Sequence, residues 1–182
     1  MGRQMFGGGE GDWGDESWKG WWGDDPPYHV PVFVLTHHPR EPVPMEGGTT
    51  FHFVTDGIES ALEQARAAAG DGDVQIAGGA DVIQQYLRAG VVDEFQVSVA
   101  PKFLGGGVRL FDGLGNDELK LQVVRAVESP QRTDCSRAVT GTTASSERTT
   151  TMPPASAVLP SRSWRCRSAS SRPETPSRRS RP

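Results

Sequence analysis

The stretch Val74-Gln-Ile-Ala-Gly-Gly-Ala-Asp-Val82 decides how the fold is interpreted. A short apolar, β-branched run leads into two glycines, and a helical pattern follows them. Glycine lets the backbone approach a ligand closely, and a helix N-terminus offers free N–H groups and the positive end of a dipole. The stretch therefore predicts a strand–turn–helix unit suited to a diphosphate, and the alternative is a plain strand-to-helix turn. The candidate contacts are Gly78, Gly79, Ala80 and Asp81.

The segments around this unit alternate between strand and helix patterns. Strands are predicted at residues 31–36, 51–54, 74–77, 95–100 and 119–127, and helices at 58–69 and between Gly79 and Gly90. Residues 7–29 are rich in Gly, Asp and Trp and predict a long loop. The alternation predicts an α/β fold with a mostly parallel sheet and helices on both of its faces.

Two further groups of polar residues are predicted at one edge of this sheet. Gly2 and Arg3 begin the chain, and Thr36, His37 and His38 follow the first full strand. Ligands of parallel sheets bind beyond the carboxyl ends of the strands, which places the second group beside the glycine turn. An arginine and a histidine there suit the extra phosphate of NADP through charge-assisted hydrogen bonds. A solvated turn is the alternative for the two histidines.

Charge divides the chain near Pro130. Residues 1–130 carry 9 Lys and Arg against 20 Asp and Glu, whereas residues 131–182 carry 10 Arg, no Lys and 3 acids. The second part is rich in Arg, Ser, Pro and Thr and lacks periodic apolar content, so it predicts a disordered tail. We therefore expect a domain at 1–130 and a disordered tail at 131–182, whose composition is typical of a frame-shifted reading of a GC-rich gene.

Several classes of protein are disfavoured by composition. The acidic body makes nucleic acid an unfavourable partner, and no apolar run approaches the roughly 20 residues that cross a bilayer. The histidines at 29, 37, 38 and 52 match no tight ligand spacing, so no metal site is predicted. Both cysteines lie in the tail and cannot staple the body. We expect a soluble cytoplasmic protein without a membrane partner.

Five segments, taken in order, resemble the dihydrofolate-reductase-like family. Within that family they are most similar to the C-terminal reductase domain of the bacterial bifunctional deaminase-reductase of riboflavin biosynthesis. The segments are MGRQMF (1–6), PVFVLTHH (31–38), IAGGA (76–80), VDEFQVSVAP (92–101) and FLGGGVRLF (103–111). The resemblance covers about residues 1–130, and the order and spacing of all five segments make it more specific than any one of them.

The resemblance implies a three-layer dihydrofolate-reductase-like domain and assigns roles to residues. In the family, the Gly-Arg element and the segment at 36–38 hold the adenosine phosphate of NADPH, and the Gly-Gly turn holds the diphosphate. The glycine-rich loop lies near the substrate, and here it is formed by Leu104, Gly105, Gly106 and Gly107.

The implied function is that of an NADP-dependent oxidoreductase. The family transfers a hydride from NADPH to a small-molecule substrate, as 5-amino-6-(5-phosphoribosylamino)uracil reductase and dihydrofolate reductase do. The resemblance thus implies a pterin or a ribosyl-pyrimidine as substrate, and relatives are often homodimers. The protein orients the cofactor, whose nicotinamide supplies the hydride.

The sequence departs from the family at both ends. Family members carry a segment with the first, central strand before the Gly-Arg element, and a catalytic acid is expected there, so no catalytic residue is nominated. Residues 131–137 lack the pattern of the family's final strand, so we expect the fold to lack its first and last strands. Two other functions stay open: an inactive truncated or frame-shifted fragment, and a nucleic-acid-binding module with a basic tail.

Overall fold

The computed structural model describes residues 1–14, 16–114, 120–140 and 164–166. The helices are α1 (Arg3–Phe6), α2 (Gly57–Ala69) and α3 (Ala80–Arg88), with a 3-10 turn at Glu46–Gly48. The strands are β1 (Pro31–Leu35), β2 (Val43–Pro44), β3 (Thr50–Val54), β4 (Val74–Ile76), β5 (Glu94–Val99), β6 (Lys120–Ser129), β7 (Arg132–Thr140) and β8 (Trp164–Cys166). The predicted strands and both predicted long helices are therefore present, and the fold is mixed α/β.

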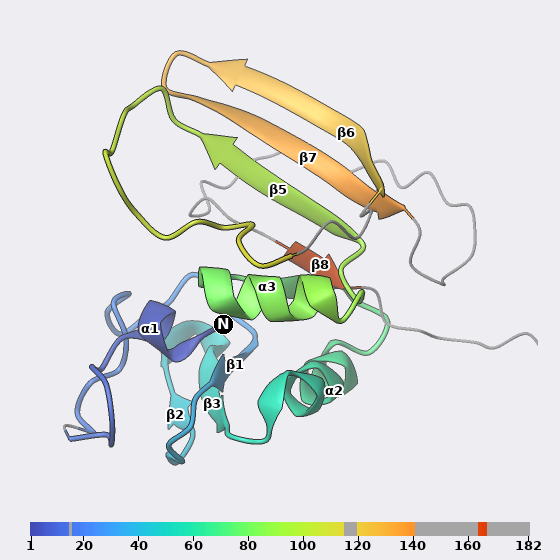
Figure 1. Ribbon diagram of the computed structural model, residues 1–182. Coiled ribbons are helices and arrows are strands. Elements are labelled where there is room, and N and C mark those ends of the chain that lie inside the picture. The colour runs from blue at the N-terminus through green and yellow to red at the C-terminus, as the bar shows by residue number, and fades with distance from the viewer. Residues whose placement is uncertain (15, 115–119, 141–163, 167–182) are drawn as a thin grey trace, which may run out of the picture.

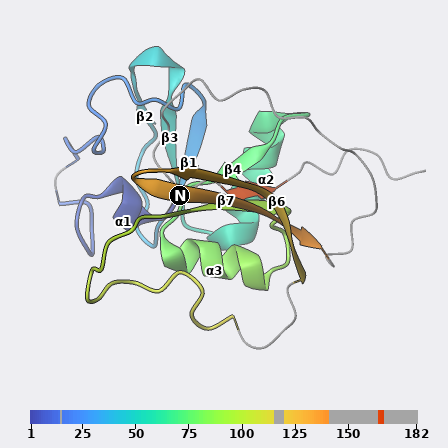
Figure 2. The same cartoon turned by 90° about the horizontal axis from the view of Figure 1, so that it is seen from above.

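Two sheets form the framework. The smaller one has the order β1-β3-β2, with β1 and β3 parallel and β2 antiparallel to β3. The larger has the order β4-β8-β5-β7-β6, and all its neighbours are antiparallel. Figure 1 shows α3 between the long strands β5, β7 and β6 and the smaller sheet. In Figure 2, which looks from above, the β6–β7 hairpin passes over the region between α3 and the smaller sheet.

The prediction of a mostly parallel sheet is wrong for the larger sheet. The unit β4-α3-β5 keeps its two strands in the same direction, because each is antiparallel to β8. However, β8 lies between them, so they are not neighbours. The strands β6 and β7 are joined by a two-residue turn, and so short a connection can join only antiparallel strands.

The prediction that the last strand is missing is also wrong. Residues Arg132–Thr140 form β7, which pairs with β5 on one side and β6 on the other. Backbone hydrogen bonds on both sides hold a strand whose side chains lack a strong apolar pattern. The sheet thus continues past the predicted boundary at Pro130 and the predicted start of the tail at 131. Residues 141–163 and 167–182 of that predicted tail lie outside the described residues.

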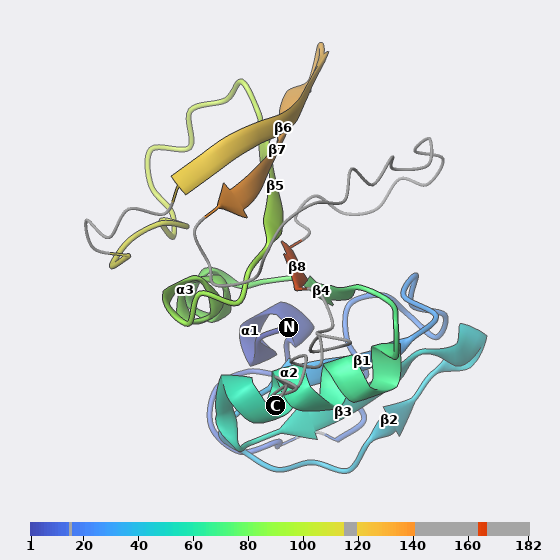
Figure 3. The same ribbon diagram turned by 90° about the vertical axis from the view of Figure 1, so that its right-hand side faces the viewer.

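Two apolar clusters hold the elements together. The larger lies among α2, β4, α3 and β5 and includes Leu62, Ile83 and Phe95. Hydrophobic residues at helical spacing on α3 supply much of it, as the sequence predicts. The second cluster centres on Phe6, which is fully buried, and three tryptophans of the 7–29 loop pack against it: Trp13, Trp18 and Trp22. In Figure 3, α2 lies beside β1 and β3.

Within the described ranges, no helix combines the length and the apolar content needed to cross a membrane.

Candidate functional site

The glycine turn between β4 and α3 has a geometry that only glycine at position 78 and open space at position 79 allow. Gly78 is buried and has φ of +113°, a conformation that residues with a Cβ rarely adopt. Gly79 has an extended backbone and precedes α3, where no side chain caps the helix. A Cβ added at Gly79 would have no atom within 4 Å. The first amides of an α-helix have no partner inside the helix, so open space and free donors meet at this turn.

Gly2 joins the glycine turn to the smaller sheet. Its N–H donates to the Gly78 carbonyl (2.7 Å), and Gly2 also forms a parallel bridge with Leu35. A Cβ at Gly2 would lie 2.9 Å from Cγ2 of Val82 on α3, so the site requires a residue without a side chain. This contact places Arg3, the next residue, beside the start of α3.

The Arg3 guanidinium faces the loop that follows α1. It stacks on the Trp13 ring at 3.9 Å from the centroid and donates to the backbone carbonyls of Gly11 and Asp12. The Nε atom of Arg3 is buried and has no hydrogen-bond partner among the described residues. A buried donor without a partner costs free energy that an anionic ligand at this place would recover.

The turn after β1 is held by its own hydrogen bonds. Thr36 is buried, and its Oγ1 accepts from the His38 N–H at 3.1 Å. The His38 Nδ1 lies 2.7 Å from Oδ1 of Asp12, and Trp13 Nε1 donates to the His38 carbonyl at 2.9 Å. His37 is exposed. The loop at 11–13 therefore covers one side of both Arg3 and His38.

These elements enclose one pocket of about 840 Å³. That volume is within the range of small-molecule sites. The pocket is lined by all nine residues predicted to bind a cofactor: Gly2, Arg3, Thr36, His37, His38, Gly78, Gly79, Ala80 and Asp81. The structure thus brings together three segments that are far apart in the sequence.

The predicted substrate-side loop does not join them. Leu104, Gly105, Gly106 and Gly107 are exposed and do not line this pocket, although the next residue, Val108, does. Sequence reasoning missed other lining residues, among them Thr55, Gly57 and Ile58. Thr55 follows β3, which is parallel to β1. Thr36 was predicted because ligands bind beyond the carboxyl ends of parallel strands, and the same rule applied to β3 predicts Thr55.

Charges around the pocket have both signs. Arg3 and the two histidines line it together with the carboxylates of Glu10 and Asp81. In the part of the chain that the structure describes, no group of three or more His, Cys, Asp or Glu side chains is arranged to hold a metal ion. The Arg3 guanidinium, the α3 N-terminus and the open space beside Gly79 fit a phosphorylated ligand.

Comparisons with known proteins identify the family of the chain. The family model of the RibD C-terminal domain matches residues 10–134, which include the glycine turn and extend into β7. "Uncharacterized protein YwjB" of Bacillus subtilis (strain 168) is 32% identical over 71 residues, which are 39% of this chain and 40% of that protein.

A solved structure also matches. The "Putative riboflavin biosynthesis protein" from Shewanella sp. PV-4 superposes with a TM-score of 0.50 and 26% identity, over 63% of each chain. The chain thus spans less than two thirds of the length of either relative.

Proposed function

We propose that this chain, which belongs to the RibD C-terminal domain family, binds NADPH in the pocket between the glycine turn and Arg3 and acts as a reductase. When bound, NADPH would supply the hydride. The residues of the chain would hold and orient it. Gly78, Gly79 and the first amides of α3 would carry the diphosphate, and Arg3 with the turn at 36–38 would carry the adenosine phosphate.

The observation that carries this proposal is the meeting of Arg3, His37, His38 and Gly79 in one pocket. Two features of the pocket fit the cofactor independently. The space beyond Gly79 is open where a Cβ would stand, and Arg3 keeps one buried donor without a partner in the described chain. A phosphorylated dinucleotide needs both a close backbone approach and a cation near its second phosphate.

The family and the name of the Shewanella relative support a proposal for the substrate class. We propose a small heterocycle, either a ribosyl-pyrimidine of riboflavin biosynthesis or a pterin. We assign no catalytic residue among the residues that line the pocket. A homodimer also stays a prediction.

Substituting Arg3 by alanine is expected to weaken NADPH binding about tenfold, since one charge-assisted phosphate contact contributes roughly 1.5–3 kcal/mol and part of it is screened by solvent. NADH, which lacks the extra phosphate, should lose less affinity than NADPH. Titrations that follow the fluorescence of each reduced cofactor measure both constants. Equal losses for the two cofactors would remove Arg3 from the phosphate site, and no NADPH binding by the unmodified chain would overturn the proposed function.

Substituting Asp12 by asparagine is expected to strengthen NADPH binding by about two- to fivefold at low salt, because a carboxylate beside His38 repels a phosphate there. The gain should shrink as salt rises toward about 1 M, where exposed charges are screened. Asp24 to asparagine is the matched control, because Asp24 is also exposed but, unlike Asp12, it is not hydrogen-bonded to His38 of the pocket. Weaker binding by the Asp12 variant would mean that the contact of Asp12 with His38 keeps the pocket open, and that the Asp12 carboxylate does not repel the phosphate.

A further inference from the structure

Residues 9–12 form a strap along one wall of the proposed cofactor pocket. Gly9, Glu10 and Gly11 line the pocket, and all four residues of the strap are exposed. A Cβ added at Gly9 or at Gly11 would meet no atom within 4 Å. The backbone of the strap is therefore not packed against the core at either glycine.

Tryptophan rings hold the chain on both sides of the strap. Before it, Gly7 is buried, and a Cβ there would lie 3.0 Å from the ring of Trp18. After it, the Trp13 ring contacts the Phe53 ring edge-on, with 5.0 Å between the centroids, and Nε1 of Trp13 donates to the His38 carbonyl at 2.9 Å. Because both sides are held, the strap can move as a short segment between two fixed points.

The strap contacts two of the residues that are proposed to hold the adenosine phosphate of NADPH. The Arg3 guanidinium donates to the Gly11 carbonyl and, at 3.5 Å, to the Asp12 carbonyl. Nδ1 of His38 lies 2.7 Å from Oδ1 of Asp12. The strap thus presents oxygen acceptors to the same side chains that a phosphate would use.

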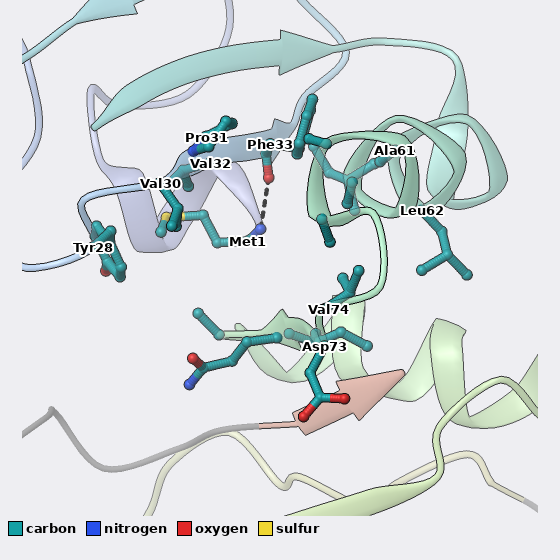
Figure 4. Close-up of a pocket in the computed structure, with 18 of the residues that line it drawn as sticks. Met1, Tyr28, Val30, Pro31, Val32, Phe33, Ala61, Leu62, Asp73 and Val74 are labelled. Carbon is teal, nitrogen blue, oxygen red and sulfur yellow. Dashed lines mark hydrogen bonds between the residues drawn. The ribbon is translucent and has the colours of Figure 1, made fainter. Parts of the chain in front are cut away.

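The backbone of Arg3 is fixed by the residues that precede it. Met1 lies beside Phe33 of β1 (Figure 4), and its carbonyl accepts from the Leu35 N–H at 2.8 Å. Gly2 forms a parallel bridge with Leu35. When the contact between Arg3 and the strap breaks, the strap is therefore the partner that moves.

The strap satisfies Arg3 only in part. The carbonyls of Gly11 and Asp12 accept from Nη1 and Nη2, whereas Nε is buried without a partner in the described part of the chain. A phosphate monoester has several oxygen acceptors close together and a full negative charge, so its hydrogen bonds to a guanidinium are stronger than those of a neutral carbonyl. A phosphate is thus the better partner for Arg3.

We propose that residues 9–12 close the adenosine-phosphate end of the pocket in the free chain and are released when that phosphate takes over Arg3 and His38. This inference rests on the proposed function, because it concerns the same pocket. NADH has no adenosine phosphate and leaves the strap in place. Opening the strap uses part of the binding free energy of NADPH, so a looser strap raises the affinity for NADPH alone.

Gly11→Ala loosens the strap without a clash. Gly11 has φ of +75°, which alanine adopts only at a cost, so the closed strap is destabilised. NADPH affinity should rise about threefold, and NADH affinity should stay within about 1.5-fold of the unmodified chain. Titrations that follow the fluorescence of each reduced cofactor measure both, and circular dichroism verifies that the variant folds.

Gly23→Ala is the matched control. Gly23 belongs to the same 7–29 loop, is exposed and has φ of +72°, and a Cβ there also meets no atom within 4 Å. It does not line the cofactor pocket. The cost of the substitution is therefore similar, but both cofactor affinities should stay within about 1.5-fold of those of the unmodified chain.

Nuclear magnetic resonance relaxation on the unmodified chain follows the strap directly. The backbone order parameters of Glu10 and Gly11 should be about 0.85 in the free chain and with NADH, and should fall below about 0.6 with saturating NADPH. Trp13, which follows the strap, should stay near about 0.85 in all three samples.

The outcomes separate this inference from the proposed function. If NADPH binds but the strap stays ordered, if Trp13 loses order with it, or if Gly11→Ala does not raise NADPH affinity, the strap is not displaced and the inference is overturned while the proposed function stands. Equal gains for NADPH and NADH would overturn it as well. If the unmodified chain binds neither cofactor at millimolar concentration, the proposed function fails and this inference fails with it.

Discussion

Replacing Gly79 by valine is expected to reduce NADPH affinity by more than about tenfold while leaving the chain folded. Gly79 has an extended backbone that valine adopts readily, and a Cβ there meets no atom within 4 Å. Gly79 is also the N-cap of α3, where valine is disfavoured, so the cost to the free energy of unfolding should be about 1–2 kcal/mol. The added methyl groups would instead occupy the space in front of the α3 amides, where the diphosphate is proposed to bind. Fluorescence titration and a thermal melt measure the two effects.

Gly106 to valine is the matched control for this substitution. Gly106 is exposed, and a Cβ there also meets no atom within 4 Å, but the residue does not line the cofactor pocket. Its NADPH affinity should stay within about twofold of the unmodified chain. If the Gly79 variant binds NADPH as well as the Gly106 variant does, the diphosphate does not lie at the glycine turn.

The free energy of unfolding is expected to rise by about 4 kcal/mol between pH 5 and pH 8 through the Met1 amine alone. Burial lowers the pKa of that amine from 8.0 to about 5 in the folded chain. Between these values the unfolded chain holds a proton that the folded chain lacks, so unfolding takes up a proton. Stability from this group is therefore complete above pH 8, decreases as the pH falls, and becomes constant below pH 5.

Acetylation of the Met1 amine isolates this contribution. The acetylated chain has no amine to protonate, so its free energy of unfolding should lack the change that the amine causes between pH 5 and pH 8. Subtracting one pH profile from the other cancels the contributions of all other titrating groups. Urea unfolding at several pH values gives both profiles, with mass spectrometry verifying that Met1 is retained. Parallel profiles for the two chains would show that the amine is exposed to water, contrary to its burial and its hydrogen bond to the Phe33 carbonyl.

Local pattern predicts most of the helices and strands. The helix α2 follows from apolar residues at helical spacing that end at Gly70, and α3 follows from its apolar face of Val82, Ile83, Tyr86 and Leu87. The glycine turn and the edge of β1 are equally local features. Both features line one pocket in the structure. They could be predicted because ligands bind beyond the carboxyl ends of strands, and the position of those ends depends only on chain direction.

Long-range pairing explains what the sequence does not predict. The insertion of β8 between β4 and β5 joins segments that no local pattern connects. The strand β7 has few apolar residues, and its pairing with β5 and β6 depends on backbone groups, which are the same in every sequence. The cover that the 11–13 loop forms over Arg3 and His38 depends on single hydrogen bonds, such as that between His38 and Asp12, which spacing does not encode.

The most direct test of the proposed site follows backbone amide signals by nuclear magnetic resonance while NADPH is added. The account predicts saturable shifts at Gly79, Ala80 and Asp81, with matching shifts at Arg3 and His38, because these residues line one pocket. Saturable shifts confined to other parts of the chain, or no shifts at millimolar NADPH, would contradict it.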